Sequence, residues 1–512
     1  MTRRKIIAGF LVIIAFAAAA RFYGLDKRGL FDADETRYYR DALHTREGID
    51  SYVNTPGPKT WKGYMGSVTP LTQAFAGKPG HTILGLIGMY CFKDTQYAVL
   101  FVNALLGVLT ILIVFRIGCV FFGAPAGLIG AAILSSCAAS VLFSRGFLAH
   151  SDQAFFLVLG VYLYMKNRTL PSGLSFGYAF LIHPTGLIYF APFLVIEGYR
   201  WIRRRRSLVG VLSFALFFLL PFAALETLSV MGRSEFGSLF TALDHSYISQ
   251  IMFTNHEAAE LGAMHNHNLG LFHLTIMSGL VNGVVNTVIF IISAVFCVIY
   301  AVKKRSREYF IVGIIPAALF VYWQFFSVHE RLFREIAVLF PFFCLGAGIF
   351  ISQLPRKVMR IILIVLVIEG AVYSSRAIIQ IKTDYNKLGS YIAYHKIEGV
   401  ITPSEYLATT ADVLMPNITG TKWYLVSSMR EAFDARQANH ADYIAVPPSV
   451  RIRSAEFRLS GKPVIAVRDP HYMYFPLFYE AAKATGDTEY FKYRRAGGEG
   501  LTGLYSLKKE DV

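Results

Sequence analysis

The sequence is short of charge and of cysteine for its length. Asp, Glu, Lys and Arg make up 16% of the 512 residues, whereas 54% of the residues are hydrophobic. A soluble fold cannot bury that much apolar surface, so the composition excludes an ordinary globular enzyme and indicates a membrane protein. The five cysteines lie in apolar segments without CxxC spacing, which argues against a disulfide framework or a cysteine metal site.

Acidic residues are fewer than basic ones, and the formal net charge is +16. In a soluble protein this excess would favour a nucleic-acid partner. Here the basic residues cluster between apolar runs, as in RRRR at 203–206, which is typical of cytoplasmic loops. No glycine-rich nucleotide loop follows a predicted strand. We therefore expect membrane lipids, and no nucleic acid, as partners of the chain.

The apolar runs are long enough to cross a bilayer many times. A helical span needs roughly 20 apolar residues, and on this basis we predict about eleven spans. They lie near 5–22, 96–120, 124–143, 151–166, 173–184, 185–199, 207–228, 277–301, 309–327, 333–352 and 359–380. The pair within 173–199 could instead be one helix kinked at Pro184.

The basic loops predict how the chain is oriented. Arg3, Arg4 and Lys5 place the N-terminus in the cytoplasm, and alternating spans then put the basic loops on that same side. Three segments are left outside: the loop 23–95, the loop 229–276 and the C-terminal segment 383–512. We expect a multi-pass protein of the cytoplasmic (inner) membrane, with its C-terminal segment in the periplasm or its equivalent.

The outer segments carry their own structure. The apolar run 81–92 is too short to span and predicts an interfacial helix. In 383–512, strand-like WYLVSS, ADYIAVPP and PVIAVRDP occur with helical MREAFDARQ and FPLFYEAAKAT, which predicts a soluble α/β domain. The predicted fold is thus an α-helical polytopic membrane domain, 1–382, followed by an extracytoplasmic α/β domain, 383–512.

The stretch FDADETRYYR at 31–40 places three carboxylates just after the first predicted span. Asp32 and Glu35 fit a capping box at the start of an amphipathic helix, where acidic residues also suit the helix dipole. The cap does not need Asp34. This carboxylate is therefore the first candidate for catalysis on a lipid headgroup.

Further candidates lie on the same predicted side. Asp152, in FLAHSDQAFF, starts a span, where it could merely cap the helix or serve function, as ionisable residues at the edge of a span often do. Lys78, Arg331 and Arg334 either snorkel to the interface or clamp a phosphate. His183, in LIHPTG, is either structural or a further phosphate ligand.

The loop 229–276 is rich in histidine. His265 and His267, with Glu257 nearby, could offer two imidazoles and a carboxylate to a metal. Their spacing fits no standard zinc motif. The alternative is a polar loop that binds the acceptor through hydrogen bonds from its histidines. A divalent metal is thus possible by composition, and no residue is assigned to it.

Together these motifs resemble the GT-C membrane glycosyltransferases, specifically the protein O-mannosyltransferase and aminoarabinose (lipid A) transferase superfamily. The resemblance covers roughly residues 1–380. It rests on DADETRYYRDAL, KPG at 78–80, FLAHSDQAFF, AFLIHPTGL and RLFREIAVLFP. The chain departs from the family at Gly77, where an acidic residue is often found, and at Gly80, where the family has a second Pro. His183 stands in place of Lys or Arg, and Glu335 in place of Tyr.

The resemblance implies an inverting glycosyltransferase that moves a sugar from a polyprenyl-phosphate donor to an acceptor on the outer face of the cytoplasmic membrane. The acceptor would be lipid A or lipopolysaccharide, a glycan or a protein hydroxyl. Asp34 would be the catalytic base, supported by Asp152. The predicted substrate-binding residues are Glu35, Arg37, Tyr38, Lys78, His183, Arg331 and Arg334.

Two other functions use similar parts. A lipid-linked glycan polymerase or ligase would also take a polyprenyl-linked donor, usually one that carries an oligosaccharide. A transporter or flippase of lipid-linked sugars would carry charged residues inside the bundle, near the membrane midplane. The predicted spans are almost free of charge away from their ends, which disfavours the transporter.

Overall fold

The structure is a computed structural model, and it describes most of the chain. The described ranges are 2–30, 33–60, 78–92, 95–233, 282–326, 333–380, 383–415, 420–448, 462–468 and 501–507, with a few isolated positions between them. The chain divides into two compact units. The helical unit consists of Met1–Tyr23 and Tyr38–Ser375, and the second unit of Gly24–Arg37 and Arg376–Val512.

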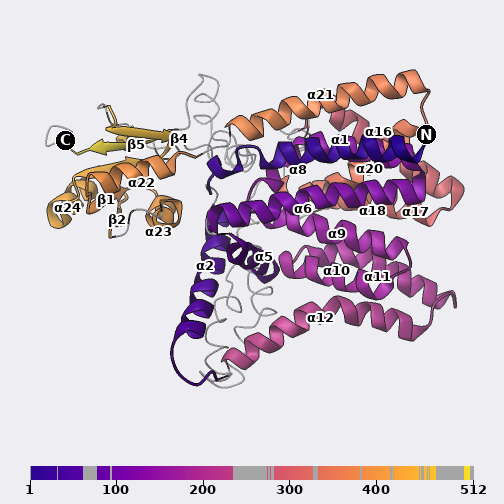
Figure 1. Ribbon diagram of the computed structural model, residues 1–512, viewed down its shortest axis with the longest axis horizontal. Coiled ribbons are helices and arrows are strands. Elements are labelled where there is room, and N and C mark those ends of the chain that lie inside the picture. The colour runs from indigo at the N-terminus through magenta and orange to yellow at the C-terminus, as the bar shows by residue number, and fades with distance from the viewer. Residues whose placement is uncertain are drawn as a thin grey trace. The chain divides into compact units, whose positions relative to one another are not determined.

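Long apolar helices build the helical unit, and many of them lie side by side (Figure 1). Short 3-10 and π segments are labelled η. The elements up to the end of α21 are α1 (Arg3–Phe22), η1 (Leu25–Lys27), α2 (Ala33–Asn54), α5 (Pro79–Cys91), α6 (Thr95–Ile117), η2 (Gly118–Phe122), α7 (Ala124–Ser136), α8 (Ala138–Ser144), α9 (Ala149–Met165), α10 (Thr169–Ile182), α11 (Gly186–Ile202), α12 (Leu208–Arg233), α16 (Val284–Lys304), α17 (Arg307–Tyr309), η4 (Phe310–Ile314), α18 (Ile315–Val321), η5 (Tyr322–Phe326), α19 (Phe333–Ala337), α20 (Phe340–Ser352) and α21 (Arg356–Gln380).

Helices occupy all the predicted spans as far as the structure describes them. Among the described residues, α1, α6, α12, α16 and α21 are long and apolar enough to cross a membrane, and the bent pair α7–α8 makes a sixth if it counts as one span. The remaining predicted spans are shorter or broken helices. The predicted class, a multi-pass helical membrane protein, is confirmed, and the total of about eleven spans stays a prediction.

The predicted pair within 173–199 is two helices. α10 ends at Ile182, and α11 begins at Gly186. Between them His183 has extended backbone angles, φ −155° and ψ 134°, which cannot continue a helix. The alternative of a single helix kinked at Pro184 is therefore wrong. The break places His183 outside both helices, where its ring contacts Thr185 and faces Glu335.

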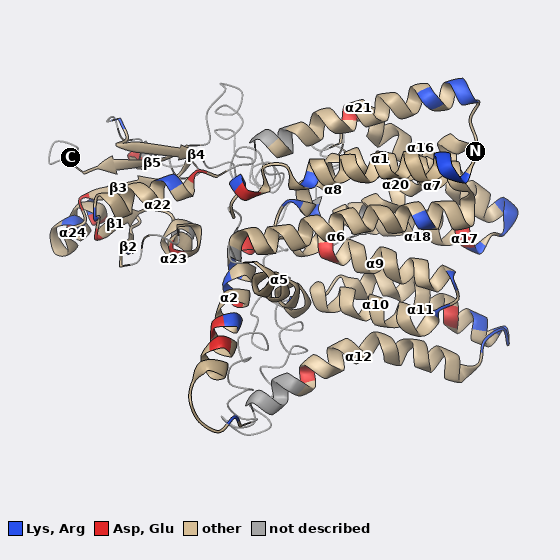
Figure 2. Ribbon diagram, in the orientation of Figure 1, with Lys and Arg blue, Asp and Glu red and all other residues tan. Residues whose placement is uncertain are grey.

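Lys and Arg collect at one end of the helical unit, around the N-terminus and the connections that follow α9, α11, α16 and α20 (Figure 2). These cations are mostly exposed, and they are Arg3, Arg4, Lys5, Lys166, Arg168, Arg203, Arg204, Arg205, Arg206, Lys303, Lys304, Arg305, Arg307, Arg356, Lys357 and Arg360. The loops predicted to be basic thus share one end. That this end faces the cytoplasm stays a prediction from the charge rule.

Two buried arginines hold the bend between α7 and α8, which is 60°. Arg21 donates hydrogen bonds to the last carbonyls of α7, Leu134 O and Ser135 O, at 3.4 and 3.3 Å. Arg145, just after α8, donates to the carbonyls of Arg21 and Tyr23 at the end of α1, at 2.9 Å each. Each arginine satisfies carbonyls that a helix end leaves without an intrahelical partner. α8, and the turn that leads into α9, are fixed in this way.

The second unit contains a five-stranded sheet of order β2-β1-β3-β5-β4. β1, β2 and β3 are parallel, and β5 runs antiparallel to β3 and β4. The remaining elements are α22 (Tyr385–Tyr394), β1 (Gly399–Thr402), α23 (Glu405–Leu414), β2 (Lys422–Leu425), α24 (Met429–Asn439), β3 (Tyr443–Val446), η6 (Ala455–Phe457), β4 (Ile465–Arg468) and β5 (Leu501–Ser506).

The sheet confirms the predicted α/β character of this region. WYLVSS, ADYIAVPP and PVIAVRDP contribute β2, β3 and β4, and MREAFDARQ forms most of α24. A core of buried side chains that includes Tyr385, Leu388 and Val400 packs α22 against the strands. The predicted helix in FPLFYEAAKAT lies outside the described residues.

Candidate functional site

Buried polar side chains gather at the end of the helical unit opposite the basic loops. α9 and α11 start at this end and finish at the basic end, whereas α10 runs in the other direction. The side chains come from the starts of α5 and α9, from the break between α10 and α11, and from α19. They form two clusters, one around Asp152 and one around Glu335.

The first cluster joins α2, α5 and α9 through Tyr38, Lys78, His81 and Asp152. His81 Nδ1 and Asp152 Oδ2 lie 2.7 Å apart, and both side chains are fully buried. The Lys78 ammonium donates a hydrogen bond to the Tyr38 hydroxyl and lies 4.8 Å from the centroid of that ring. The edge of Tyr38 also faces His81, with the ring centroids 5.0 Å apart. Lys78, Tyr38 and Asp152, three predicted site residues, are thus brought together through a histidine that the sequence did not single out.

The first turn of α5 sets the spacing of Lys78 and His81. Lys78 is the residue before the helix, and Pro79 occupies the first helical position, where its missing N–H and fixed φ cost least. His81 follows on the first turn, with its Nε2 donating to the Phe147 carbonyl at 3.3 Å and its ring stacked on Phe147 at 4.1 Å between centroids. The imidazole is therefore held from both nitrogens and one face.

Asp152 does not cap its helix. The residue before α9 is Leu148, no side chain caps the helix start, and Asp152 turns instead to His81. The capping interpretation of Asp152 is therefore wrong. Its second oxygen, Oδ1, is buried and has no hydrogen-bond partner among the described residues. A buried carboxylate oxygen left in this way is costly unless a substrate or solvent group meets it.

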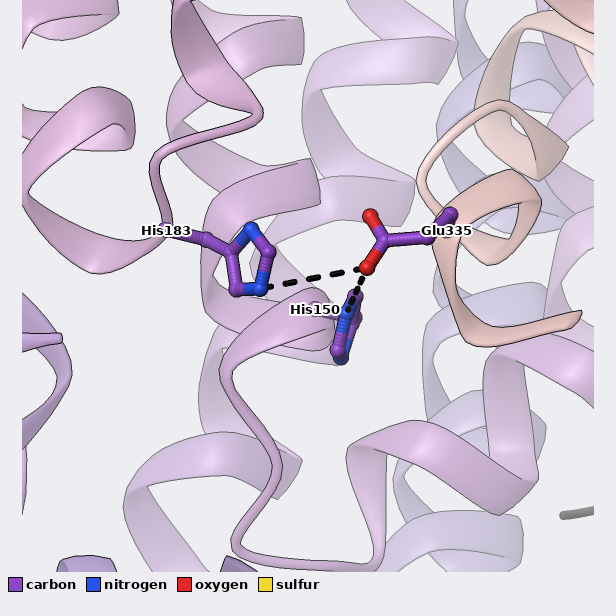
Figure 3. A group of neighbouring side chains, drawn as sticks. All are labelled: His150, His183 and Glu335. Atoms are coloured by element: carbon purple, nitrogen blue, oxygen red, sulfur yellow. Dashed lines mark ion pairs between the residues drawn. The ribbon is translucent and has the colours of Figure 1, made fainter. Parts of the chain in front are cut away.

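The second cluster consists of His150, His183 and Glu335 (Figure 3). Glu335 Oε1 lies 3.5 Å from His150 Nε2 and 3.9 Å from His183 Nε2. The three ligand atoms all lie within 4.8 Å of one another, which makes this the group among the described residues that could hold a metal ion. His183 is therefore not a lone histidine, and neither His150 nor Glu335 was predicted as a site residue.

Neighbouring side chains hold this cluster in place. His183 Nδ1 lies 2.8 Å from Thr185 Oγ1, which in turn is 3.3 Å from Gln153 Oε1. The Tyr189 hydroxyl donates to the Glu335 backbone carbonyl at 2.7 Å. The α10–α11 break and α19 are thus tied together around the cluster.

The start of α2 and its preceding segment belong to the second unit. Both Glu35 oxygens accept hydrogen bonds from Arg28, at 2.6 and 3.1 Å, and this ion pair is buried. Thr383 donates to the Arg28 carbonyl from its N–H and its hydroxyl, at 3.0 and 3.1 Å. Glu35, predicted to bind substrate, therefore has an internal partner, Arg28, within the second unit. Asp34 is half-buried in the first turn of α2, and Arg37 is exposed.

The remaining predicted residues are placed in part. Arg334 is half-buried in α19, next to Glu335. Asp32, Arg331 and the histidines of the loop 229–276, His273 included, lie outside the described residues. The only sequence feature that could have pointed to Glu335 as a site residue is that it replaces the Tyr usual in the family. No sequence feature pointed to His81, because its partner Asp152 is 71 positions away.

Residues 79–224 match the family described as dolichyl-phosphate-mannose-protein mannosyltransferase. No curated protein matches the chain. Among solved structures, the chain is similar to ArnT from Cupriavidus metallidurans bound to undecaprenyl phosphate, with a TM-score of 0.57 and 15% identity over 89% of this chain and 96% of that one. It is also similar to the oligosaccharyltransferase AglB from Archaeoglobus fulgidus in complex with an inhibitory peptide and a dolichol-phosphate, with a TM-score of 0.55 and 11% identity over 99% of this chain and 74% of that one.

Proposed function

We propose that the chain transfers a sugar from a polyprenyl-phosphate donor to a hydroxyl acceptor on the outer face of the cytoplasmic membrane. The premises are its GT-C glycosyltransferase fold and the match of residues 79–224 to the mannosyltransferase family. ArnT and AglB, which have this fold, were solved with undecaprenyl phosphate and with a dolichol-phosphate. The proposed donor therefore belongs to the class of lipid that both bind.

The observation that carries the proposal is the gathering of cationic and acid–base side chains at the end opposite the basic loops. A phosphate on a membrane-embedded carrier is an anion that must be met at the membrane surface. Lys78 is 8% exposed, and its ammonium donates a hydrogen bond to the Tyr38 hydroxyl. Arg334 precedes Glu335 in α19, and the Glu335 carboxylate lies 3.5 Å from His150 Nε2. These two cations would stabilise the charge that develops on the departing phosphate.

Asp34 is proposed as the base. It would take the proton from the acceptor hydroxyl while that oxygen attacks the anomeric carbon from the side opposite the phosphate. The new glycosidic bond forms as the bond between the anomeric carbon and the phosphate oxygen breaks, so the anomeric configuration inverts. The electron pair leaves with the phosphate, which stays on the carrier lipid.

Asp152 has a different proposed role, which is to position Lys78. Its carboxylate is held by His81 on the first turn of α5, the helix that Lys78 precedes. The pair thus ties the start of α5 to the start of α9. Asp152 supports the site without contacting the reacting atoms, and the base remains Asp34.

A monosaccharide transferase is the first hypothesis, and a lipid-linked glycan polymerase or ligase is the second.

The test is mass spectrometry of envelope lipids and glycans from cells with and without the protein. We expect one glycan or glycolipid to lose the mass of a single sugar, and cells that express Asp34→Asn at the same level to show the same loss. A complete glycan profile in cells without the protein would contradict the proposed transfer. Loss of a whole oligosaccharide block, and not of one sugar, would favour the polymerase or ligase.

A further inference from the structure

We propose that His150, His183 and Glu335 bind one divalent transition-metal ion, with zinc as the best fit. The two imidazoles and the carboxylate come from three separate elements and converge within 4.8 Å of one another (Figure 3). Two of the three side chains are buried, and His183 is at 9% exposure. The cluster therefore lies inside the protein, and is not a chance meeting of surface groups.

The shortest distance within the cluster, from Glu335 to His150, is that expected between two ligands of one metal ion. A charge-assisted hydrogen bond between an imidazole and a carboxylate is about 2.7–2.9 Å long. Glu335 Oε1 lies 3.5 Å from His150 and 3.9 Å from His183, beyond that length. Two ligands about 2.0–2.1 Å from one tetrahedral zinc ion lie roughly 3.4 Å apart. The His81–Asp152 pair, at 2.7 Å, shows what a direct hydrogen bond looks like in this same chain.

The cluster also leaves buried polar atoms without a partner. Neither ring nitrogen of His150 makes a hydrogen bond to the described residues, and neither does Glu335 Oε2. Buried polar groups are almost always satisfied, and leaving one unmet costs about 1–3 kcal/mol. An ion bound to His150 Nε2 would satisfy the imidazole lone pair. The same ion would be coordinated by the Glu335 carboxylate and would balance its negative charge.

The surroundings of His183 suit a ligand that binds through Nε2. His183 Nδ1 lies 2.8 Å from Thr185 Oγ1 and accepts a hydrogen bond from the Thr185 backbone N–H at 3.3 Å. These contacts hold the ring at Nδ1 and leave Nε2 as the nitrogen that faces Glu335 Oε1, 3.9 Å away.

The donor set selects the kind of metal. Magnesium and calcium prefer all-oxygen ligands, whereas two imidazoles with one carboxylate suit zinc and leave a fourth position open. If the proposed transfer is correct, that position would take an oxygen of the donor phosphate, because Arg334, proposed to bind that phosphate, lies next to Glu335 in α19. The binding of the ion itself does not depend on the transfer.

The test is the zinc content of the full-length protein, purified in detergent through a tag without histidine. The protein is stripped with a chelator, reloaded with Zn²⁺ and analysed by inductively coupled plasma mass spectrometry. We expect Glu335→Gln and His150→Ala to bind one equivalent fewer than the wild type, or to bind it at least ~10-fold more weakly. The matched control is His395→Ala, an exposed histidine of the second unit, which should bind as the wild type does. The comparison with the wild type also removes any contribution from the histidines of the loop 229–276.

A second measurement does not depend on loss of binding. His183→Cys replaces an imidazole by a thiolate, so loading with Co²⁺ should produce a thiolate-to-cobalt charge-transfer band, which His395→Cys should lack. Equal zinc content in the wild type and the monodisperse Glu335→Gln variant would overturn the site. So would wild-type protein whose Co²⁺ spectrum is that of the ion in water, a result that needs no variant to fold. Sugar transfer by metal-free protein at the wild-type rate would remove only the phosphate role of the ion.

Discussion

Asp152→Asn should weaken the use of the lipid donor, because it breaks the tie between α5 and α9. His81 and Asp152 are fully buried and 2.7 Å apart. Removing one partner of a buried ion pair outright costs about 3–5 kcal/mol. Asn keeps the size and one acceptor oxygen, so the expected loss is nearer that of one charge-assisted hydrogen bond, about 2 kcal/mol. If this loss falls on the placement of Lys78, the KM for the donor rises roughly thirtyfold, since 1.4 kcal/mol is tenfold.

The assay is transfer by purified protein at varied donor concentration, together with thermal unfolding of the same variants. Asp152→Asn, His81→Ala and the double variant form a cycle, and residues in contact should be coupled by more than about 0.5 kcal/mol. Asp384→Asn is the control, because Asp384 makes an exposed pair with Lys387, and such pairs contribute little. Additive effects in the cycle, or an unchanged donor KM with a lowered kcat, would refute the positioning role of Asp152.

Three further predictions follow from the described contacts. Lys78→Met keeps the apolar stem but removes the charge, so the KM for the donor should rise at least ~10-fold. Lys166→Met, at the basic end, is the control and should leave this KM unchanged. If both variants change the KM equally, Lys78 is only an interfacial anchor. Glu35→Gln should lower the free energy of unfolding by about 2 kcal/mol or more, because it breaks the buried bidentate pair with Arg28. Glu47→Gln, on the exposed side of α2, is the control and should change the stability little. Equal stability of the two variants would show that the Arg28–Glu35 pair does not stabilise the fold. A reporter fused after Val512 should be active outside the cytoplasm, and a cytoplasmic signal would rule out an odd number of spans with the N-terminus inside.

Apolar run length predicted the helical unit well, because a helix that must cross a bilayer needs a continuous stretch of local sequence. The bend between α7 and α8 was not predicted. The run 124–143 contains no charge, and its only proline, Pro125, stands at the helix start; the bend is held by Arg21, which reaches Ser135 across 114 positions. β1 was also missed, since a four-residue strand buried at every position has no alternation to recognise.

Some residues of the candidate site could be predicted from the sequence and others could not. Lys78 and Asp152 could be singled out because a charge next to an apolar run stands out in the sequence. His81 lies inside the apolar run 81–92, and Glu335 follows Arg331 and Arg334. Neither residue therefore stood out from the sequence around it. Each has a partner on a distant helix: His81 pairs with Asp152, and Glu335 with His150. Such pairs follow from tertiary packing, which composition and periodicity do not encode.

The first turn of α9 is where the two clusters meet. His150 and Asp152 are two positions apart, so their side chains leave the helix about 200° apart and serve different neighbours. Asn103 of α6 holds the segment that leads into this turn, because its side-chain amide donates to the carbonyls of Gly146 and Leu148, at 2.6 and 3.1 Å. A shift of the turn would therefore move the acid that holds His81 and the histidine that faces Glu335 together. The proposed phosphate-binding residue Lys78, held through His81 and Asp152, and the proposed metal site are thus coupled through one turn of α9, and a change at Asn103 should disturb both.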